Sequence, residues 1–281
     1  MKKSPIFLLI LIFFACKSGF LKIKADLPKS LNEVSGTEKT PKSDLIWMLN
    51  DSGNKPKLYG INKKGDIITK LNINAKNNDW EDLAADTDGN IYIGDFGNNE
   101  GKRKDLSILK VSASHLDQEN EVDIERITFK YENQEKFPPK NKNMYFDCEA
   151  FFYFNNNLYL FTKSRVKGDH GKTNMYKVPA KAGNHVAKLV ESFTTCEDAS
   201  CWVTAADISD DGKQVALLTQ NGVWLFSNFS TDNFFSGTLK TYPFKNYTQK
   251  EGVCFKDNNT LYITDEKAHG EGGNLYEMSL N

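Results

Sequence analysis

A segment that recurs along the chain limits its possible folds more than any other feature. In its clearest copy, residues 80–99, a strand-forming run (Glu81 to Ala85) leads through a Thr-Asp-Gly-Asn turn into a second run, Ile91 to Ile93. Alternation in the first run places every second residue, Glu81 among them, on one face. The turn composition favours a tight reversal of the chain. The segment therefore predicts a pair of antiparallel strands.

Further copies of the same pattern can be aligned with this one. Each is followed by a third strand, usually with an aromatic residue, and in most copies by a fourth. Repeating four-stranded units of this size are typical of a β-propeller, in which each unit is one blade. The five copies start at Glu33, Glu81, Glu149, Thr204 and Glu251.

The two ends of the chain predict how such a ring would close. Residues 20–27 alternate like a strand before the first copy, and the fifth copy reaches the last residue after its third strand. We expect the N-terminal strand to complete the last blade, which removes an exposed sheet edge. The predicted fold is all-β, a single propeller domain over residues 16–281 with five blades of four strands. A six-bladed ring stays an alternative, because residues 112–145 could contain additional strands.

The first residues read as an export signal. Two lysines precede an apolar run, Ile6 to Phe14, that is too short to span a bilayer and is typical of a signal peptide over residues 1–15. Ala15-Cys16 resembles a bacterial lipobox, although Phe13 departs from the usual Leu. The resemblance implies cleavage before Cys16 and lipidation of its thiol, hence a lipid anchor in the bacterial cell envelope, facing the periplasm or the cell surface. An ordinary signal peptide cut nearby is the alternative.

Cysteine spacing gives a second expectation for an exported chain. Cys196 and Cys201 bracket four residues before the fourth copy, which favours a disulfide over two free thiols. The closed loop is small, so we expect the bridge to shape one loop rather than to hold the fold. Cys148 and Cys254 lie in inner strands, where small buried hydrophobic residues are expected.

Propeller geometry predicts where the acidic residues gather. The innermost strand of each blade lines the axis, and the next strand runs antiparallel to it, so the start of the first and the end of the second share one face. Several carboxylates there repel one another unless some are protonated or a cation lies among them, and the sequence shows no counter-charge in the matching position of copy four. Oxygen ligands without His or Cys favour Ca²⁺; alternatively, each Glu caps its own blade through backbone hydrogen bonds. The ring comprises Glu33, Glu81, Glu149, Thr204 and Glu251, with Asp51, Asp95 and Asp265 beside it.

The repeat starts LNEVSG, WEDLAAD and KEGVCF, with a fourth copy that lacks Glu, resemble two propeller groups. These are the SdiA-regulated family and the calcium-activated nucleotidases, or apyrases. The resemblance covers all five copies. It implies a five-bladed propeller with an axial calcium, surrounded by Glu33, Glu81, Glu149, Thr204 and Glu251.

A basic loop should overhang the same face. Residues 163–172 include Lys163 and Arg165, and Arg can bind a phosphate with two parallel hydrogen bonds. His269, in the matching loop of the fifth copy, is a candidate acid–base group. An ordinary solvated loop is the alternative interpretation. With a net charge of −1, a nucleic-acid or polybasic membrane surface is not expected.

Two functions are compatible with these features. One is a monomeric, calcium-bearing lipoprotein that binds a small anionic ligand or an envelope protein. The other is a calcium-dependent phosphohydrolase acting on nucleotides or phosphoesters, in which the metal polarises a phosphoryl oxygen.

Overall fold

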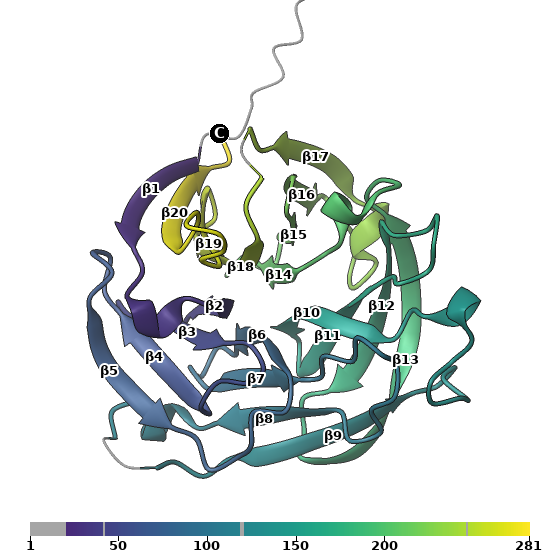
Figure 1. Ribbon diagram of the computed structural model, residues 1–281, viewed down its shortest axis with the longest axis horizontal. Helices are drawn as coiled ribbons and strands as arrows, with labels where there is room; N and C mark the ends of the chain where they lie inside the picture. Colours follow the sequence, from purple (N-terminus) through teal and green to yellow (C-terminus); the bar gives the residue numbers. More distant parts are fainter. Residues whose placement is uncertain (1–20, 42, 119–120, 246) are drawn as a thin grey trace, which may run out of the picture.

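The structure is a computed structural model that describes residues 21–41, 43–118, 121–245 and 247–281 (Figure 1). The predicted signal peptide, the lipobox at Cys16 and the first residue of the predicted N-terminal strand, Phe20, lie outside the described residues. In the part of the chain that is described, no helix is long and apolar enough to cross a membrane.

The described residues form an all-β structure whose strands surround a central axis (Figure 1). We use the word blade for each antiparallel unit of four strands. Blade one contains β2 (Val34–Lys39), β3 (Ile46–Asn50), β4 (Lys57–Ile61) and β5 (Ile67–Asn72); blade two contains β6 (Trp80–Ala85), β7 (Ile91–Asp95), β8 (Ser107–Val111) and β9 (Glu125–Tyr131). Blade three contains β10 (Asp147–Phe154), β11 (Asn157–Lys163), β12 (Lys172–Pro179) and β13 (Gly183–Thr194). Blade four contains β14 (Ala205–Ile208), β15 (Gln214–Thr219), β16 (Gly222–Ser227) and β17 (Thr238–Pro243); blade five contains β18 (Lys250–Asp257), β19 (Thr260–Asp265), β20 (Asn274–Ser279) and β1 (Leu21–Asp26).

The N-terminal strand closes the ring as predicted. Strand β1 pairs antiparallel with β20, with Leu21 opposite Met278 and Asp26 opposite Asn274. It is therefore the outermost strand of the sheet whose other three strands come from the C-terminal end of the chain (Figure 1). This pairing satisfies backbone groups of β20 that would otherwise form an open edge.

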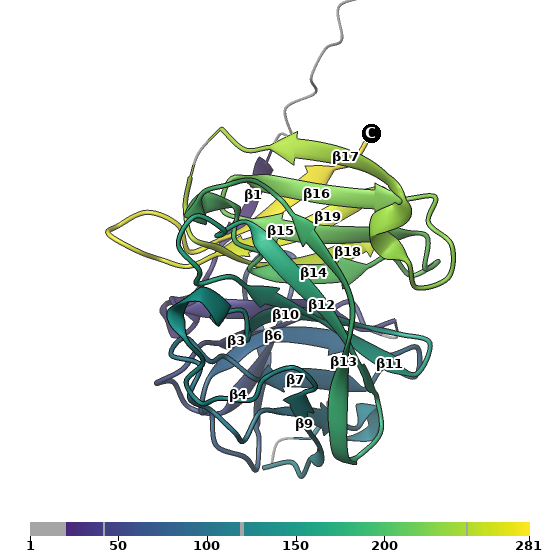
Figure 2. The ribbon, with the colours of Figure 1, turned by 90° about the vertical axis from the view of Figure 1, so that its right-hand side faces the viewer.

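Blades two and three share one eight-stranded sheet, which the sequence did not predict. Strand β13 is 12 residues long, and its first residues, Gly183 to Ala187, pair parallel with Ile127 to Tyr131 of β9. The rest of β13 pairs antiparallel with β12. Figure 2 shows this long strand crossing toward β9. Over this stretch, the outer edge of blade two at β9 and the outer edge of blade three at β13 cover each other.

The core lies between neighbouring blades. Inner strands β2, β6, β10, β14 and β18 pack side by side in ring order, with β18 against β2. Large side chains fill the wedges between the sheets, such as the fully buried Trp80 between blades one and two and Phe151 between blades two and three. Close approach of β2 to β6 requires Gly36, because a Cβ there would lie 2.7 Å from the backbone nitrogen of Leu83. As predicted, Cys148 and Cys254 are free, buried core residues.

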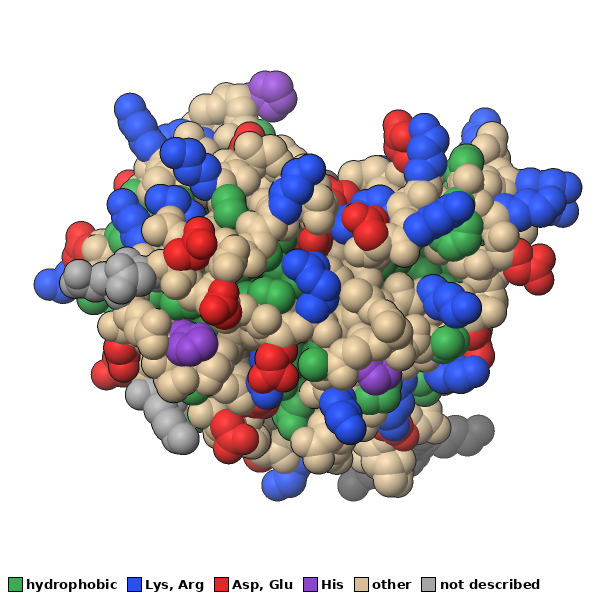
Figure 3. All heavy atoms as spheres, turned by 90° about the horizontal axis from the view of Figure 1, so that it is seen from below, with side chains coloured by type: hydrophobic (Ala, Val, Ile, Leu, Met, Phe, Trp, Pro, Cys, Tyr) green, Lys and Arg blue, Asp and Glu red, His purple; other side chains and the backbone are tan. Residues whose placement is uncertain are grey.

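Charged side chains of both signs are interspersed on the outer surface of the ring, as Figure 3 shows for one side. Several buried charged residues lie instead at the two ends of the inner strands. We call the end where the inner strands begin the upper mouth, marked by Glu81 and Glu149. The end where they finish is the lower mouth, marked by Glu38 and Asp207.

Candidate functional site

Three carboxyl groups converge at the upper mouth. Ligand atoms of Asp51, Asp79 and Glu81 all lie within 4.8 Å of one another. Asp51 directly follows β3 of blade one, whereas Asp79 directly precedes β6 of blade two and Glu81 is its second residue. The cluster is thus built across a boundary between blades.

A glycine makes room for these carboxylates. A Cβ atom at Gly97 would lie 2.1 Å from Oε1 of Glu81 and 2.5 Å from Oδ2 of Asp79. Any larger residue at position 97 would occupy the space in which the two side chains meet. No described residue donates a hydrogen bond to the carboxylate of Glu81, which is 6% exposed. The cluster therefore has the donor oxygens of a hard-cation site, packed so closely against Gly97 that a methyl group there would collide with them.

Burial and mutual repulsion disfavour the ionised forms of this cluster. Burial, followed by the charges of Glu149, Asp51 and Asp79, raises the pKa of Glu81 well above its ordinary value. Burial and the neighbouring Asp51 raise the pKa of Asp79 to about 6. Either protons or a cation must relieve this repulsion near neutral pH.

A lysine supplies part of the counter-charge, which corrects the expectation drawn from the sequence. Nζ of Lys163, at the end of β11, lies 2.8 Å from Oε1 of Glu149. Burial alone would lower the pKa of Lys163, but the carboxylates of Glu149 and Glu251 raise it above its ordinary value. Copy four has no cation in the position that matches the glutamates. The ring instead receives its cation from β11, the second strand of blade three.

Arg165 lies beside this lysine. Its Nε donates to Oδ2 of Asp147 at 2.7 Å, and Nη2 is 3.6 Å from Oε1 of Glu149. The ring of Trp202 covers both cations, with its centroid 5.2 Å from Nζ of Lys163 and 5.2 Å from Cζ of Arg165. The indole nitrogen of Trp202 donates to the carbonyl of Ser164 at 2.6 Å. Two cations and an indole therefore border the acidic cluster.

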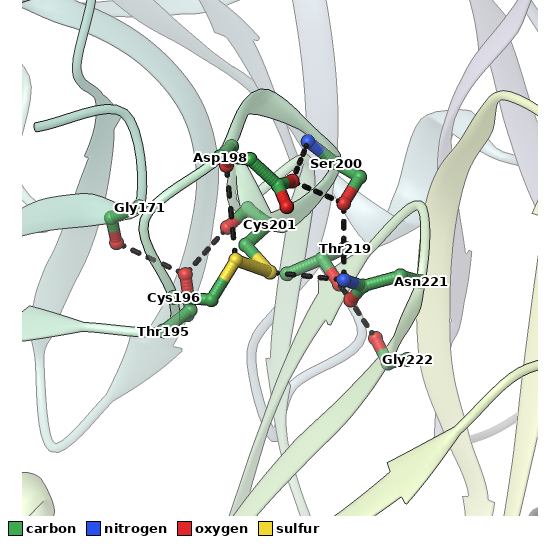
Figure 4. Close-up of a disulfide and its surroundings, with 9 residues drawn as sticks. All are labelled: Gly171, Thr195, Cys196, Asp198, Ser200, Cys201, Thr219, Asn221 and Gly222. Carbon is green, nitrogen blue, oxygen red and sulfur yellow. Dashed lines mark hydrogen bonds between the residues drawn. A yellow bond between two sulfur atoms is a disulfide. The ribbon is translucent and has the colours of Figure 1, made fainter. Parts of the chain in front are cut away.

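The disulfide that the sequence predicted positions this tryptophan. Cys196 and Cys201 are bonded, and Trp202 is the next residue. Figure 4 shows the bridge held from two sides: Thr195 Oγ1 donates to the carbonyls of Gly171 and Cys201, and the amide of Asn221 donates to Ser200 Oγ at 3.1 Å. The loop is thereby tied to the chain just before β12 and to the turn between β15 and β16.

Several predicted site residues lie elsewhere or are occupied by other contacts. Glu33 is exposed and accepts from the amide of Asn54 at 2.5 Å, and Thr204 Oγ1 donates to the carbonyl of Lys250 at 2.6 Å. Asp95 is fully buried and pairs with Arg103 at 3.0 Å. Asp265 is also fully buried; it accepts from the Tyr276 hydroxyl at 2.7 Å and the backbone nitrogen of Asn274 at 2.9 Å. His269 is exposed in its loop.

Other predicted residues do come together. Glu81, Glu149 and Glu251 all act on Lys163, and Asp51 acts on both Glu81 and Glu251. Burial raises the pKa of Glu251 to about 7. The upper mouth thus combines Asp51, Glu81, Glu149, Glu251, Lys163 and Arg165 from the predicted set.

Sequence reasoning missed three members of this mouth. Asp79 could have been found, because it stands two residues before Glu81 in a strand start. Trp202 carried a weaker signal, its position next to Cys201. Glu266, whose pKa burial and the charge of Glu251 raise to about 8, follows Asp265 at the end of β19, and nothing in the repeat pattern pointed to it.

Comparisons with known proteins agree on the fold. No protein-family model matches the chain, and no curated protein matches it. Among solved structures, a gluconolactonase from Xanthomonas campestris matches with a TM-score of 0.52 at 12% identity, over 95% of this chain and 91% of that one. The PQQ-bound aldose sugar dehydrogenase from Streptomyces coelicolor matches with a TM-score of 0.54 at 10% identity, over 93% of this chain and 98% of that one. At such identities the likeness concerns the β-propeller fold alone.

Proposed function

We propose that this chain is an exported, lipid-anchored β-propeller of a bacterial cell envelope that binds Ca²⁺ at the upper mouth. The observation that carries the proposal is the convergence of Asp51, Asp79 and Glu81 within 4.8 Å. The resemblance of the repeat starts to the calcium-activated nucleotidases supports the same ion. Asp79 belongs to this cluster, whereas Glu33 and Thr204, which the sequence had assigned to the metal site, do not.

Calcium suits this donor set better than a transition metal. All three side chains offer carboxylate oxygen, and neither imidazole nor thiolate belongs to the cluster. Ca²⁺ also tolerates irregular arrangements and accepts water and carbonyl oxygens as further ligands. Bound there, the ion would supply positive charge that offsets the repulsion responsible for the raised pKa values of Asp79 and Glu81.

The face beside the calcium site suits a small anionic ligand. Arg165 uses Nε for Asp147, which leaves donors on its terminal nitrogens for a carboxylate or phosphate. Trp202 offers an apolar surface next to that guanidinium. We assign Lys163 mainly to neutralising Glu149, and Arg165 to contacting the ligand.

A calcium-dependent phosphohydrolase is the second candidate function. The favouring observation is that Glu251 and Glu266 have pKa values raised to about 7 and about 8 at the same mouth, which suits proton transfer near neutral pH. A bound calcium ion would polarise a phosphoryl oxygen. A screen of nucleotides and phosphoesters, with and without Ca²⁺, should show turnover that Glu266→Gln abolishes. Absence of turnover on every substrate would leave the binding function.

Calcium binding is tested by thermal unfolding of the mature protein after treatment with a chelator. Added Ca²⁺ should raise the Tm, because a ligand at 100 times its Kd stabilises the native state by about 2.7 kcal/mol. Glu81→Gln should remove most of this response. Glu132→Gln, which changes net charge equally but lies directly after the outer strand β9, should retain it. A Tm that is insensitive to Ca²⁺, with no metal found by elemental analysis, would contradict the proposal.

The anchor is tested separately. In the native host, the Cys16→Ser protein should move from the membrane fraction to the soluble fraction. Unchanged membrane association would contradict lipidation at Cys16. Size-exclusion chromatography with light scattering checks the expected monomer.

A further inference from the structure

A cavity lies at the lower mouth, at the opposite end of the inner strands from the proposed calcium site. Its volume is about 620 Å³, within the range of small-molecule sites. All five inner strands contribute to its lining as they end, through Glu38 of β2, Ala85 of β6, Phe154 of β10, Asp207 of β14 and Phe255 of β18. The cavity therefore lies where the five inner strands end around the axis.

Three buried carboxylates lie in the wall of this cavity, those of Glu38, Asp86 and Asp207. Asp86 accepts from the side chains of Asn90 and Tyr92. Glu38 is 6% exposed and Asp207 is 7% exposed. Oε1 of Glu38 accepts from the backbone nitrogen of Lys39 at 2.6 Å, and no described residue donates to its Oε2. Both oxygens of Asp207 accept from backbone nitrogens at 2.7 Å, those of Ile208 and Phe255. Glu38 is thus held by its own strand, and Asp207 by its own strand and by β18 of the next blade.

No side-chain cation among the described residues neutralises this pair. The lysine that lines the cavity, Lys39, directs its Nζ to the carbonyl of Lys256 at 3.5 Å and forms no ion pair with Glu38 or Asp207. Burial, then the charges of Asp207 and Asp82, raise the pKa of Glu38 well above its ordinary value. A cation from solution would relieve this repulsion, as Lys163 does at the upper mouth.

One part of the lining is apolar and aromatic, formed by Phe154, Phe255, Ile208 and Tyr153. The remainder is polar and adds further acidic residues, Asp86, Asp210 and Asp211. Aromatic faces attract ammonium groups, and apolar walls gain from burying hydrocarbon. The described acidic groups with metal-ligand spacing are instead at the upper mouth. This lining favours an organic cation over a bare metal ion.

We propose that the lower mouth binds a small organic cation, a protonated amine with an apolar body. The ammonium group lies against Glu38 and Asp207, and the hydrocarbon part contacts Phe154 and Phe255. This site is independent of the proposed calcium site, because it is formed by the opposite ends of the same strands.

Isothermal titration calorimetry of the mature protein with phenethylamine, near pH 8 so that more of the carboxyl groups are ionised, tests this site. Saturable binding of one amine per chain is expected. The neutral analogue 2-phenylethanol and the anion 3-phenylpropionate should bind at least about tenfold more weakly, since they cannot pair with the buried carboxylates. No saturable binding of the amine, or equal binding of the alcohol, would overturn the proposal.

Variants and mapping locate the site. Glu38→Gln keeps the acceptor for the Lys39 nitrogen and should weaken phenethylamine binding about tenfold or more. Glu132→Gln, directly after the outer strand β9, should leave the Kd within about twofold. Unchanged affinity in Glu38→Gln would overturn the proposal. As a readout that needs no variant, amide chemical shifts in the wild-type protein should move at Ala85, Asp207 and Phe255. Shifts confined to the upper mouth, around Gly97, would overturn it as well.

Discussion

Nζ of Lys163 lies 2.8 Å from Oε1 of Glu149, inside a mouth that also holds Asp51, Glu81 and Glu251. The lysine comes from the end of β11 and the glutamate from the start of β10, so the pair is built within one blade. The lysine forms its ion pair with the glutamate of blade three. Asp51, Asp79 and Glu81, which form no ion pair with a described residue, lie between blades one and two, where the calcium site is proposed.

Removing this lysine should increase the dependence on calcium. Lys163→Met leaves Glu149 buried without its partner, and loss of one member of a buried ion pair costs about 3–5 kcal/mol. We expect a lower Tm in chelator and a larger rise on adding Ca²⁺ than the wild-type protein shows. Lys167→Met, at an exposed position of the same loop, is the control and should resemble wild type. Equal calcium responses in Lys163→Met and wild type would refute the view that Lys163 and bound calcium both offset the negative charge of the upper mouth.

The space at Gly97 gives a test of the cluster that needs no metal. Gly97→Ala places a methyl group against Glu81 and Asp79 and should destabilise the fold by about 1–3 kcal/mol, as overpacking usually does. In a Glu81→Ala background, which removes the closest contact, the same substitution should cost less. Denaturant unfolding of the four proteins measures the coupling energy. Additive effects would show that the two residues do not compete for that space.

The repeat pattern was enough to predict the fold because it combines strand periodicity with turn chemistry in every copy. Ring closure also followed from sequence, since one strand was missing at the C-terminal end and one was in excess at the N-terminal end. The parallel pairing of β9 with β13 did not, because nothing in a local pattern indicates that a strand continues onto a neighbouring blade. The disulfide was predictable from its spacing and the expected export.

The site was predicted less completely. Repetition identified Glu81, Glu149 and Glu251 at equivalent strand starts, but equivalence does not determine side-chain direction or loop position. Glu33 precedes β2 rather than lying in it, and its side chain is exposed. Asp95 and Asp265 are held by partners that lie outside the repeat starts, Arg103 for the first and Tyr276 for the second. The lower mouth was not predicted because Glu38 and Asp207 lie near the ends of their strands, whereas the repeated acidic positions lie at strand starts.

Strand β1 offers a test of ring closure. A mature chain that begins at Pro28 loses the pairing of Leu21 to Asp26 with β20 and exposes that edge. We expect a markedly lower Tm and concentration-dependent association, because unpaired edges add strands from other molecules. Differential scanning calorimetry and light scattering measure both effects. A truncated protein that melts at the wild-type temperature would show that β1 does not stabilise the ring.

The disulfide should matter more to the upper mouth than to the fold. Replacing Cys196 and Cys201 together by Ser opens only a short loop, so we expect a loss of about 3 kcal/mol or less. Trp202, which follows the bridge, should become more mobile over Lys163 and Arg165, visible as a change in tryptophan fluorescence and its quenching by iodide. A double variant with unchanged fluorescence but much lower stability would show that the disulfide supports the fold rather than the position of Trp202.

Stability should fall as pH rises through the range in which Glu38 loses its proton. Because the pKa of Glu38 is raised in the folded protein, the native state holds a proton that the unfolded chain releases. Its contribution is fully present below the ordinary Glu pKa, about 4.3, and is lost as pH rises through the folded pKa. Glu38→Gln cannot ionise, so its unfolding free energy should decline less steeply with pH and exceed that of wild type at pH 8. The control is Glu132→Gln, since the backbone of Leu189 and the side chain of Lys188 lower the pKa of Glu132 and give the opposite sign. Urea unfolding across the pH range measures both slopes, and a Glu38→Gln profile parallel to wild type would contradict the raised pKa.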